Sequence, residues 1–189
     1  LYIVCNVTPQ LVKVDLASKS QSILLTADHL IGGTAVVKMD QAIIVADSEY
    51  NYTDASQTEG KLIVITNDNQ IITHKTATPN PTFISAIQSG GQQYLVSSNS
   101  DIIQYDENWN PTPPSQSCVQ LWTIDDLTNE ADPAVKTHCE TNSSVGRISH
   151  SDSKLYIGDG VTPKVYSTDI AKIKDFDAWS SIPLDNGDK

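Results

Sequence analysis

The chain has 189 residues, enough for a buried core, and its 23 acidic and 12 basic residues give a net charge of −11. An acidic surface repels a phosphate backbone, so this composition argues against a nucleic-acid partner. No apolar run reaches the roughly 18 residues that a transmembrane helix needs, so no transmembrane segment is expected.

The chain divides into the units 1–30, 31–80, 81–143 and 144–189, each with short apolar runs bounded by Asp, Asn, Gly or Ser. Runs of this length that are rich in Val, Ile and Thr are typical of β-strands. In chain order, the expected strands are Leu1–Asn6, Gln10–Leu16, Gln21–Thr26, Ala35–Val37, Ala42–Ala46, Leu62–Ile65, Ile71–Thr73, Phe83–Ile87, Gln93–Ser97, Cys118–Ile124, Val135–Cys139, Val145–Ile148, Lys154–Gly158, Lys164–Ser167 and Ser181–Leu184. A short helix is an alternative for Ile170–Trp179.

Units of four short antiparallel strands that repeat along a chain are typical of a β-propeller. We therefore predict an all-β fold, a propeller segment of about four four-stranded antiparallel blades. A β-sandwich also has many short strands but needs no such repeat, and a solenoid has shorter and more uniform repeats. Because the first unit lacks a first strand, we expect a larger propeller, and we expect the isolated segment to associate through exposed sheet edges.

The segments 155–160 (LYIGDG) and 164–169 (KVYSTD) form a strand pattern that resembles the YVTN and lactonase-like propeller superfamily. The resemblance covers most of the chain through a degenerate motif, and the signatures of WD40 and kelch propellers are absent. It implies a propeller fold in a protein that is often periplasmic or secreted. It carries over no catalytic residue.

The three cysteines give the most specific local signal. If a hairpin is centred midway between Cys118 and Cys139, the two residues face each other directly on neighbouring strands, within reach of a disulfide. The alternative is two free thiols on neighbouring strands. We predict the disulfide and, from it, an extracytoplasmic location: periplasm, cell surface or secreted. Cys5 is then left over. Residues 1–5 superficially resemble the end of a lipoprotein signal, but Val4 stands where that signal needs Gly, Ala or Ser, so we expect a buried strand with a buried thiol.

Metal and catalytic motifs are weak. No Cys-x-x-Cys or His pair has ligand spacing, and no Gly-x-Ser-x-Gly elbow marks a nucleophile. Asp47 and Glu49 begin an acidic loop with partial EF-hand spacing, but Tyr52 stands where Gly is needed and Thr58 where Glu is needed. We therefore expect a solvated acidic loop, with no metal and no cofactor. His74 and His138 occupy equivalent repeat positions, which indicates a structural role for both.

In an up-and-down unit, the loops after the second and fourth strands emerge at the same end. That end collects the long segments Asp47–Gly60, Asn99–Ser117 and Asp159–Pro163, and long loops on a rigid frame are where recognition is usual. The candidate binding residues are Tyr105, Asp106, Glu107, Trp109, Asp47 and Glu49. Aromatic rings offer large contact area, and the carboxylates favour a cationic or sugar-like ligand. The alternative is that Ile102–Tyr105 and Trp109 pack the insertion onto its own unit.

We therefore expect an extracytoplasmic binding or scaffold module whose partner is a protein, a carbohydrate or a small molecule. Catalysis is less expected than binding. One alternative is a lactonase-like or other hydrolytic propeller enzyme, with catalytic groups converging on a central channel. Another is a structural cell-surface repeat domain without a discrete pocket.

Overall fold

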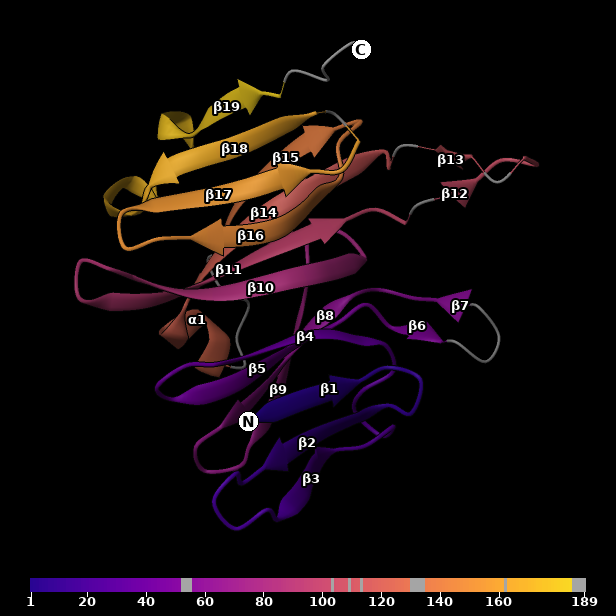
Figure 1. Ribbon diagram of the computed structural model, residues 1–189, viewed down its shortest axis with the longest axis vertical. Helices are drawn as coiled ribbons and strands as arrows, with labels where there is room; N and C mark the ends of the chain where they lie inside the picture. The colour runs from indigo at the N-terminus through magenta and orange to yellow at the C-terminus, as the bar shows by residue number, and fades with distance from the viewer. Residues whose placement is uncertain are drawn as a thin grey trace.

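Repeated antiparallel sheets make up the molecule. The computed structural model describes residues 1–51, 56–102, 104–108, 110–112, 114–129, 135–161 and 163–184. Within these residues, four sheets of three or four strands follow one another along the chain (Figure 1), and we call them sheets 1 to 4. This confirms the prediction of an all-β chain with repeated antiparallel sheets.

Each sheet is a meander in which neighbouring strands pair antiparallel in chain order. Sheet 1 consists of β1 (Tyr2–Cys5), β2 (Gln10–Val14) and β3 (Gln21–Leu25). Sheet 2 consists of β4 (Gly33–Lys38), β5 (Ala42–Asp47), β8 (Lys61–Thr66) and β9 (Ile71–Lys75). Sheet 3 consists of β10 (Asn80–Ser89), β11 (Gln92–Ser100), β14 (Gln116–Thr123) and β15 (Lys136–Thr141). Sheet 4 consists of β16 (Val145–His150), β17 (Lys154–Asp159), β18 (Lys164–Asp169) and β19 (Ser180–Pro183).

Smaller elements lie in the connections between these strands. One hairpin, β6 (Tyr50–Asn51) with β7 (Ser56–Gln57), follows β5, and another, β12 (Gln104–Tyr105) with β13 (Pro111–Thr112), follows β11. The helical turns are α1 (Ile124–Thr128), η1 (Ile170–Lys172) and η2 (Phe176–Ala178). The last two are separate 3₁₀ turns, so the single helix considered for Ile170–Trp179 does not form. None of the helices in the described part of the chain is long and apolar enough to cross a membrane.

Sheet 2 is buried on both faces, which explains why its apolar runs are continuous instead of alternating. Ile44 and Val64 pair across β5 and β8 and face sheet 3, whereas Val45 and Ile63 pair on the opposite face and contact sheet 1. All four side chains are fully buried. The sheet is therefore the middle layer between two apolar cores.

Three apolar cores hold the sheets face to face in chain order. Leu11 and Leu25 of sheet 1 pack with Val45 and Ile63 of sheet 2. The core between sheets 2 and 3 includes Met39, Ala42, Ile44, Ala46, Leu62, Val64, Ile72, Leu95, Trp122 and Leu127. The core between sheets 3 and 4 includes Ile87, Tyr94, Val96, Val119, Leu121, Val145, Leu155, Ile157, Tyr166, Ile170 and Ile173. Figure 1 shows the resulting stack, from β3 at one end to β19 at the other.

Neighbouring sheets approach closely at their first strands and are wedged apart at their outer strands. β10 lies against β4 on one side and β16 on the other, whereas α1 lies between β8 and β9 of sheet 2 and β11 and β14 of sheet 3. His74 on β9 reaches α1, with Nε2 2.9 Å from the carbonyl oxygen of Leu127. Between sheets 3 and 4, the His138 ring on β15 stacks on Phe176 of η2 at 5.6 Å. The two histidines therefore have equivalent structural roles, because each contacts the helical segment that lies between two neighbouring sheets.

The pairing of β14 with β15 places Cys118 directly opposite Cys139, and the two form a disulfide with Cα atoms 4.1 Å apart. This confirms the predicted bond. Cys118 is fully buried, and Cys5 is free and half-buried on β1. The disulfide joins the third and fourth strands of sheet 3, the sheet with the longest insertion.

Candidate binding face

One end of the stack carries the connections that follow the first and third strands of sheet 1, the second strands of sheets 2 to 4, and the fourth strands of sheets 2 and 3. We call it the loop end; it comprises the described residues of 6–9, 26–32, 48–60, 76–79, 101–115, 142–144 and 160–163. Both small hairpins, β6–β7 and β12–β13, project from this end on neighbouring sheets (Figure 1). The two sets of connections are joined by backbone hydrogen bonds. The N–H of Thr76 donates to Gly60 and that of Gly160 to Ser144, at 3.1 and 2.8 Å.

An aspartate at the last residue of the second strand fixes the base of this end in two sheets. Asp47 ends β5, is fully buried, and accepts hydrogen bonds from the backbone N–H groups of Ile31, Gly32 and Glu49 at 3.0, 2.7 and 2.9 Å. It thereby ties the loop entering β4 to the loop leaving β5. Because its oxygens are occupied inside the protein, the expected solvated loop does not include Asp47.

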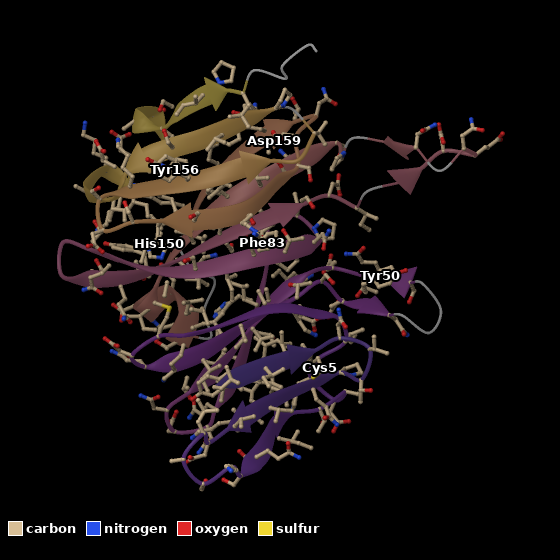
Figure 2. All side chains as sticks on the ribbon, in the orientation of Figure 1. Cys5, Tyr50, Phe83, His150, Tyr156 and Asp159 are labelled. Atoms are coloured by element: carbon tan, nitrogen blue, oxygen red, sulfur yellow. A yellow bond between two sulfur atoms is a disulfide. The ribbon has the colours of Figure 1, made fainter. Side chains whose placement is uncertain are left out.

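Asp159 occupies the same place in sheet 4. It ends β17 opposite Val145, just as Asp47 lies opposite Gly33 in sheet 2. Its carboxylate accepts from the Ser143 hydroxyl at 2.6 Å and from the Val161 N–H at 2.9 Å. Figure 2 shows Asp159 nearer the loop end of sheet 4 than Tyr156, with Tyr50 on the projecting hairpin of sheet 2. The aspartates are thus a repeated device for shaping the loop end.

Replacing Asp47 with asparagine should lower the free energy of unfolding by about 2 kcal/mol, because a buried carboxylate that accepts backbone hydrogen bonds loses its charge. Chemical denaturation monitored by circular dichroism measures this loss. Asp106→Asn is the matched control, since Asp106 is exposed, and it should leave the denaturation midpoint unchanged. An equal loss in the two variants would contradict the role assigned to Asp47.

The remaining acidic candidates also have structural partners. Glu49 adopts a positive φ of 53°, its Oε1 lies 2.6 Å from Lys61 Nζ, and its other oxygen accepts a hydrogen bond from the Thr58 hydroxyl. Lys61 also lies 3.8 Å from Asp47, so the two acids share one cation. Glu49 therefore braces the β6–β7 hairpin against β8.

The β12–β13 hairpin carries the other candidates. Asp106 is exposed and accepts hydrogen bonds from the backbone N–H groups of Asn108 and Asn110 at 2.8 and 2.9 Å. The Asn110 side-chain amide, and then the backbone N–H groups, hold the pKa of Asp106 below its usual value. Glu107 is exposed beside it, and Tyr105 contributes its backbone to β12 opposite Pro111. Trp109 lies outside the described residues.

The structure thus places the described candidates on two hairpin regions at one end of neighbouring sheets. Asp47 and Glu49 hold the first hairpin in position, and Asp106 holds the tip of the second. Their acidity was a visible signal in the sequence. The intramolecular partners, such as Lys61 and the Ile31–Gly32 backbone, follow only from the strand register.

A polar cluster between sheets 3 and 4 had no signal in the sequence. Glu140 on β15 lies 3.4 Å from His138 Nε2 and 3.5 Å from Lys164 Nζ, and Lys164 sits 4.7 Å from the centre of the Tyr166 ring. Burial lowers the pKa of Lys164, but the Tyr166 hydroxyl and Glu140 together raise it above its usual value. The adjoining cavity measures about 10 Å³, room for one water molecule at most. The cluster therefore serves packing between the sheets.

A groove of about 470 Å³ lies at the opposite end, along Ser89, Ser153 and the η1 segment. Ser89 donates its hydroxyl hydrogen bond to the Ile170 carbonyl, and Asp169 is paired with Lys154 at 2.7 Å. These groups bond to structural partners and do not form a nucleophile–base pair. Among the described residues, no group of three or more His, Cys, Asp or Glu side chains is arranged to hold a metal ion.

Comparison with known proteins adds no family assignment to this geometry. No protein-family model matches the sequence, and no curated protein is significantly similar to it.

Proposed function

We propose that the four sheets are consecutive blades of a β-propeller and that the protein is an extracytoplasmic binding or scaffold module. Sheets that are close at their first strands and wedged apart at their outer strands support a radial arrangement. The YVTN-like strand pattern at 155–169 supports the same fold. The Cys118–Cys139 disulfide supports an oxidising compartment.

The loop end is the proposed binding face, and the two projecting hairpins carry this proposal. Each has its base or tip fixed by hydrogen bonds, through Asp47 and Glu49 in one and Asp106 in the other. A surface held in place before binding loses less entropy when a partner docks. The two hairpins project beyond the sheets and their backbones are held in place, so they are suited to recognition of a partner.

The shape and chemistry of the hairpins favour a macromolecular partner. Small-molecule sites are usually concave, whereas projecting hairpins present a convex surface. Glu107 is exposed at the tip of the β12–β13 hairpin, in a chain with a net charge of −11. We therefore propose a protein or glycan surface with cationic or hydroxyl-rich character as the partner.

The test is binding of the purified chain to a glycan array and to a panel of basic extracytoplasmic proteins, followed by two variants. Replacing Tyr105, Asp106 and Trp109 together with alanine should abolish the binding found, with an unchanged far-ultraviolet circular dichroism spectrum. Replacing Asp152 and Ser153 with alanine, at the opposite end, should preserve it.

Two results would overturn the proposal. Binding lost in the Asp152/Ser153 variant but kept in the hairpin variant would place the site at the wrong end of the stack. Turnover of lactones or phosphoesters by the purified chain would identify an enzyme instead.

A further inference from the structure

The polar groove between sheets 3 and 4 lies at the end of the stack opposite the loop end. Its volume of about 470 Å³ is that of an ordinary small-molecule site. One wall is the end of β10 and its turn (88–90), and the other is the β16–β17 turn (152–153) with the η1 segment (169–172). Figure 1 shows both turns on the side away from the projecting hairpins. The walls therefore come from sheets 3 and 4 alone.

The equivalent junction between sheets 2 and 3 is filled. Met39 precedes the two-residue turn that joins β4 to β5, and its N–H donates to the Ala42 carbonyl across that turn at 2.9 Å. Its side chain is 1% exposed in the core between the two sheets. The N–H of the next residue, Asp40, donates to the Gln93 side chain on β11 at 3.0 Å. The Met39 side chain and this hydrogen bond together close the junction.

Small residues open the same junction between sheets 3 and 4. Ser89 stands where Met39 stands in sheet 2, as the last residue before the two-residue turn that joins the first two strands. Its short side chain donates to the Ile170 carbonyl at 2.8 Å. The turn itself is Gly90 and Gly91, and a Cβ atom at either position would meet nothing within 4 Å. The groove is therefore a consequence of the residues at this turn.

Two opposite charges line the groove and form no ion pair within the described part of the chain. They are Asp152 on the β16–β17 turn and Lys172 at the end of η1, and both are exposed. The third charge, Asp169, is paired with Lys154 at 2.7 Å. The hydrogen bond and the charge of Lys154 are the main causes that lower the pKa of Asp169, and Lys172 is a minor one. Asp152 and Lys172 are therefore available to a ligand.

We propose that this groove binds a small zwitterion, a free amino acid or a short unblocked peptide, with its ammonium group at Asp152 and its carboxylate at Lys172. Hydrogen bonds between ionised groups are stronger than neutral ones, so both ends of such a ligand contribute. A simple ion would be attracted by one of the two side chains and repelled by the other, and a neutral sugar would leave both without a counter-charge. The site and its ligand class are separate from those of the loop end, so this proposal does not depend on the function proposed above.

Nuclear magnetic resonance titration of the whole chain with alanyl-alanine tests the proposal. The dipeptide should shift the backbone amide signals of Gly90, Gly91 and Ala171, and the shifts should saturate. N-acetyl-alanyl-alanine lacks the ammonium charge and alanyl-alanine amide lacks the carboxylate. Each should bind at least about tenfold more weakly than the dipeptide, because each loses one charge-assisted contact.

Variants assign each end of the ligand to its residue. Asp152→Asn should weaken binding of alanyl-alanine by about tenfold but leave binding of the acetylated form unchanged, and Lys172→Gln should do the same with the amide form. Ser89→Met should block binding by filling the groove, as Met39 fills the other junction. Asp40→Asn, on the equivalent turn of sheet 2, is the matched control and should bind like the wild type. Melting temperatures establish that each variant is folded.

Three results would overturn the proposal. The first is no saturable shift at Gly90, Gly91 or Ala171 with millimolar alanyl-alanine, with or without a shift from a neutral sugar such as trehalose. The second is equal affinity for the dipeptide and its two blocked forms. The third is unchanged dipeptide binding in both Asp152→Asn and Lys172→Gln, which would show that the two charges do not hold the ligand.

Discussion

Replacing Trp122 with alanine should lower the free energy of unfolding by about 3–5 kcal/mol, the range seen when a large buried aromatic is removed. Trp122 is 1% exposed in the core between sheets 2 and 3. Its indole Nε1 donates to the Ser97 hydroxyl at 3.2 Å, and its ring centre lies 5.7 Å from that of His74. The substitution removes packing on both sheets and leaves the Ser97 hydroxyl without its donor.

Thermal unfolding should show a fall of roughly 10 °C for this variant. Phe83→Ala is the control, because Phe83 is an aromatic residue on the same sheet but is 37% exposed, so its loss should be at most about 1 kcal/mol. Amide hydrogen exchange gives a second readout. The Trp122→Ala substitution should increase the exchange rates of β5, β8, β11 and β14 more than those of sheet 1. Equal destabilisation by Trp122→Ala and Phe83→Ala would contradict the assignment of Trp122 to the central core.

Removing the disulfide should cost about 3 kcal/mol in the chain-entropy model, because the bond closes a loop between residues separated by 21 positions. The single variants Cys118→Ala and Cys139→Ala and the double variant should all lose a similar amount, since each removes the same bond. Urea unfolding without reductant measures the three losses.

Cys5→Ala is the matched control, because Cys5 is free and half-buried. The free energy of unfolding of this variant should stay close to that of the wild type. Reductant should destabilise the wild type and the Cys5→Ala chain equally. A wild type whose unfolding midpoint is insensitive to reductant would show that the bond contributes nothing to stability.

The strands of sheets 2 and 4 were predictable because their apolar runs are short and clearly bounded. Ile44 to Ala46 and Leu62 to Ile65 are buried on both faces, so their continuous hydrophobicity reflects their burial. The disulfide was predictable for a different reason: opposite positions in a hairpin are fixed by its centre, which gave the pairing of Cys118 with Cys139.

The extent of β11 was not predictable in the same way. The predicted strand ended at Ser97, but the structure continues it to Ser100 with every one of these polar residues buried. Their partners come from distant segments. Ser98 donates to the Gly146 carbonyl at 2.7 Å, and Asn99 donates to the Gln120 side chain at 2.8 Å. A buried polar strand has no hydrophobic signal, so it is recognised only once its partners are placed.

The short helix α1 did leave a local signal. The Thr123 hydroxyl accepts from the Asp126 N–H at 3.1 Å, and the Asp126 carboxylate accepts from the Thr123 N–H at 2.8 Å, a reciprocal capping box. At the loop end, strand alternation was enough to predict which connections share an end. It could not predict that Asp47 is buried, because a single aspartate after an apolar run reads equally well as the start of an exposed loop.

The wedges between the sheets have a consequence for curvature. Where two sheets touch at their first strands, the bulk of a segment inserted at their outer strands sets the angle between them. Helix α1, which contacts β9 and β14, and η2, whose Phe176 stacks on His138 of β15, are such inserts. A stack closes on itself only when these angles add up to a full turn. The size of the connection before the fourth strand would therefore set the number of sheets in a closed ring. A thicker insert gives a larger angle between sheets and a ring of fewer sheets, and a thinner insert gives a ring of more sheets.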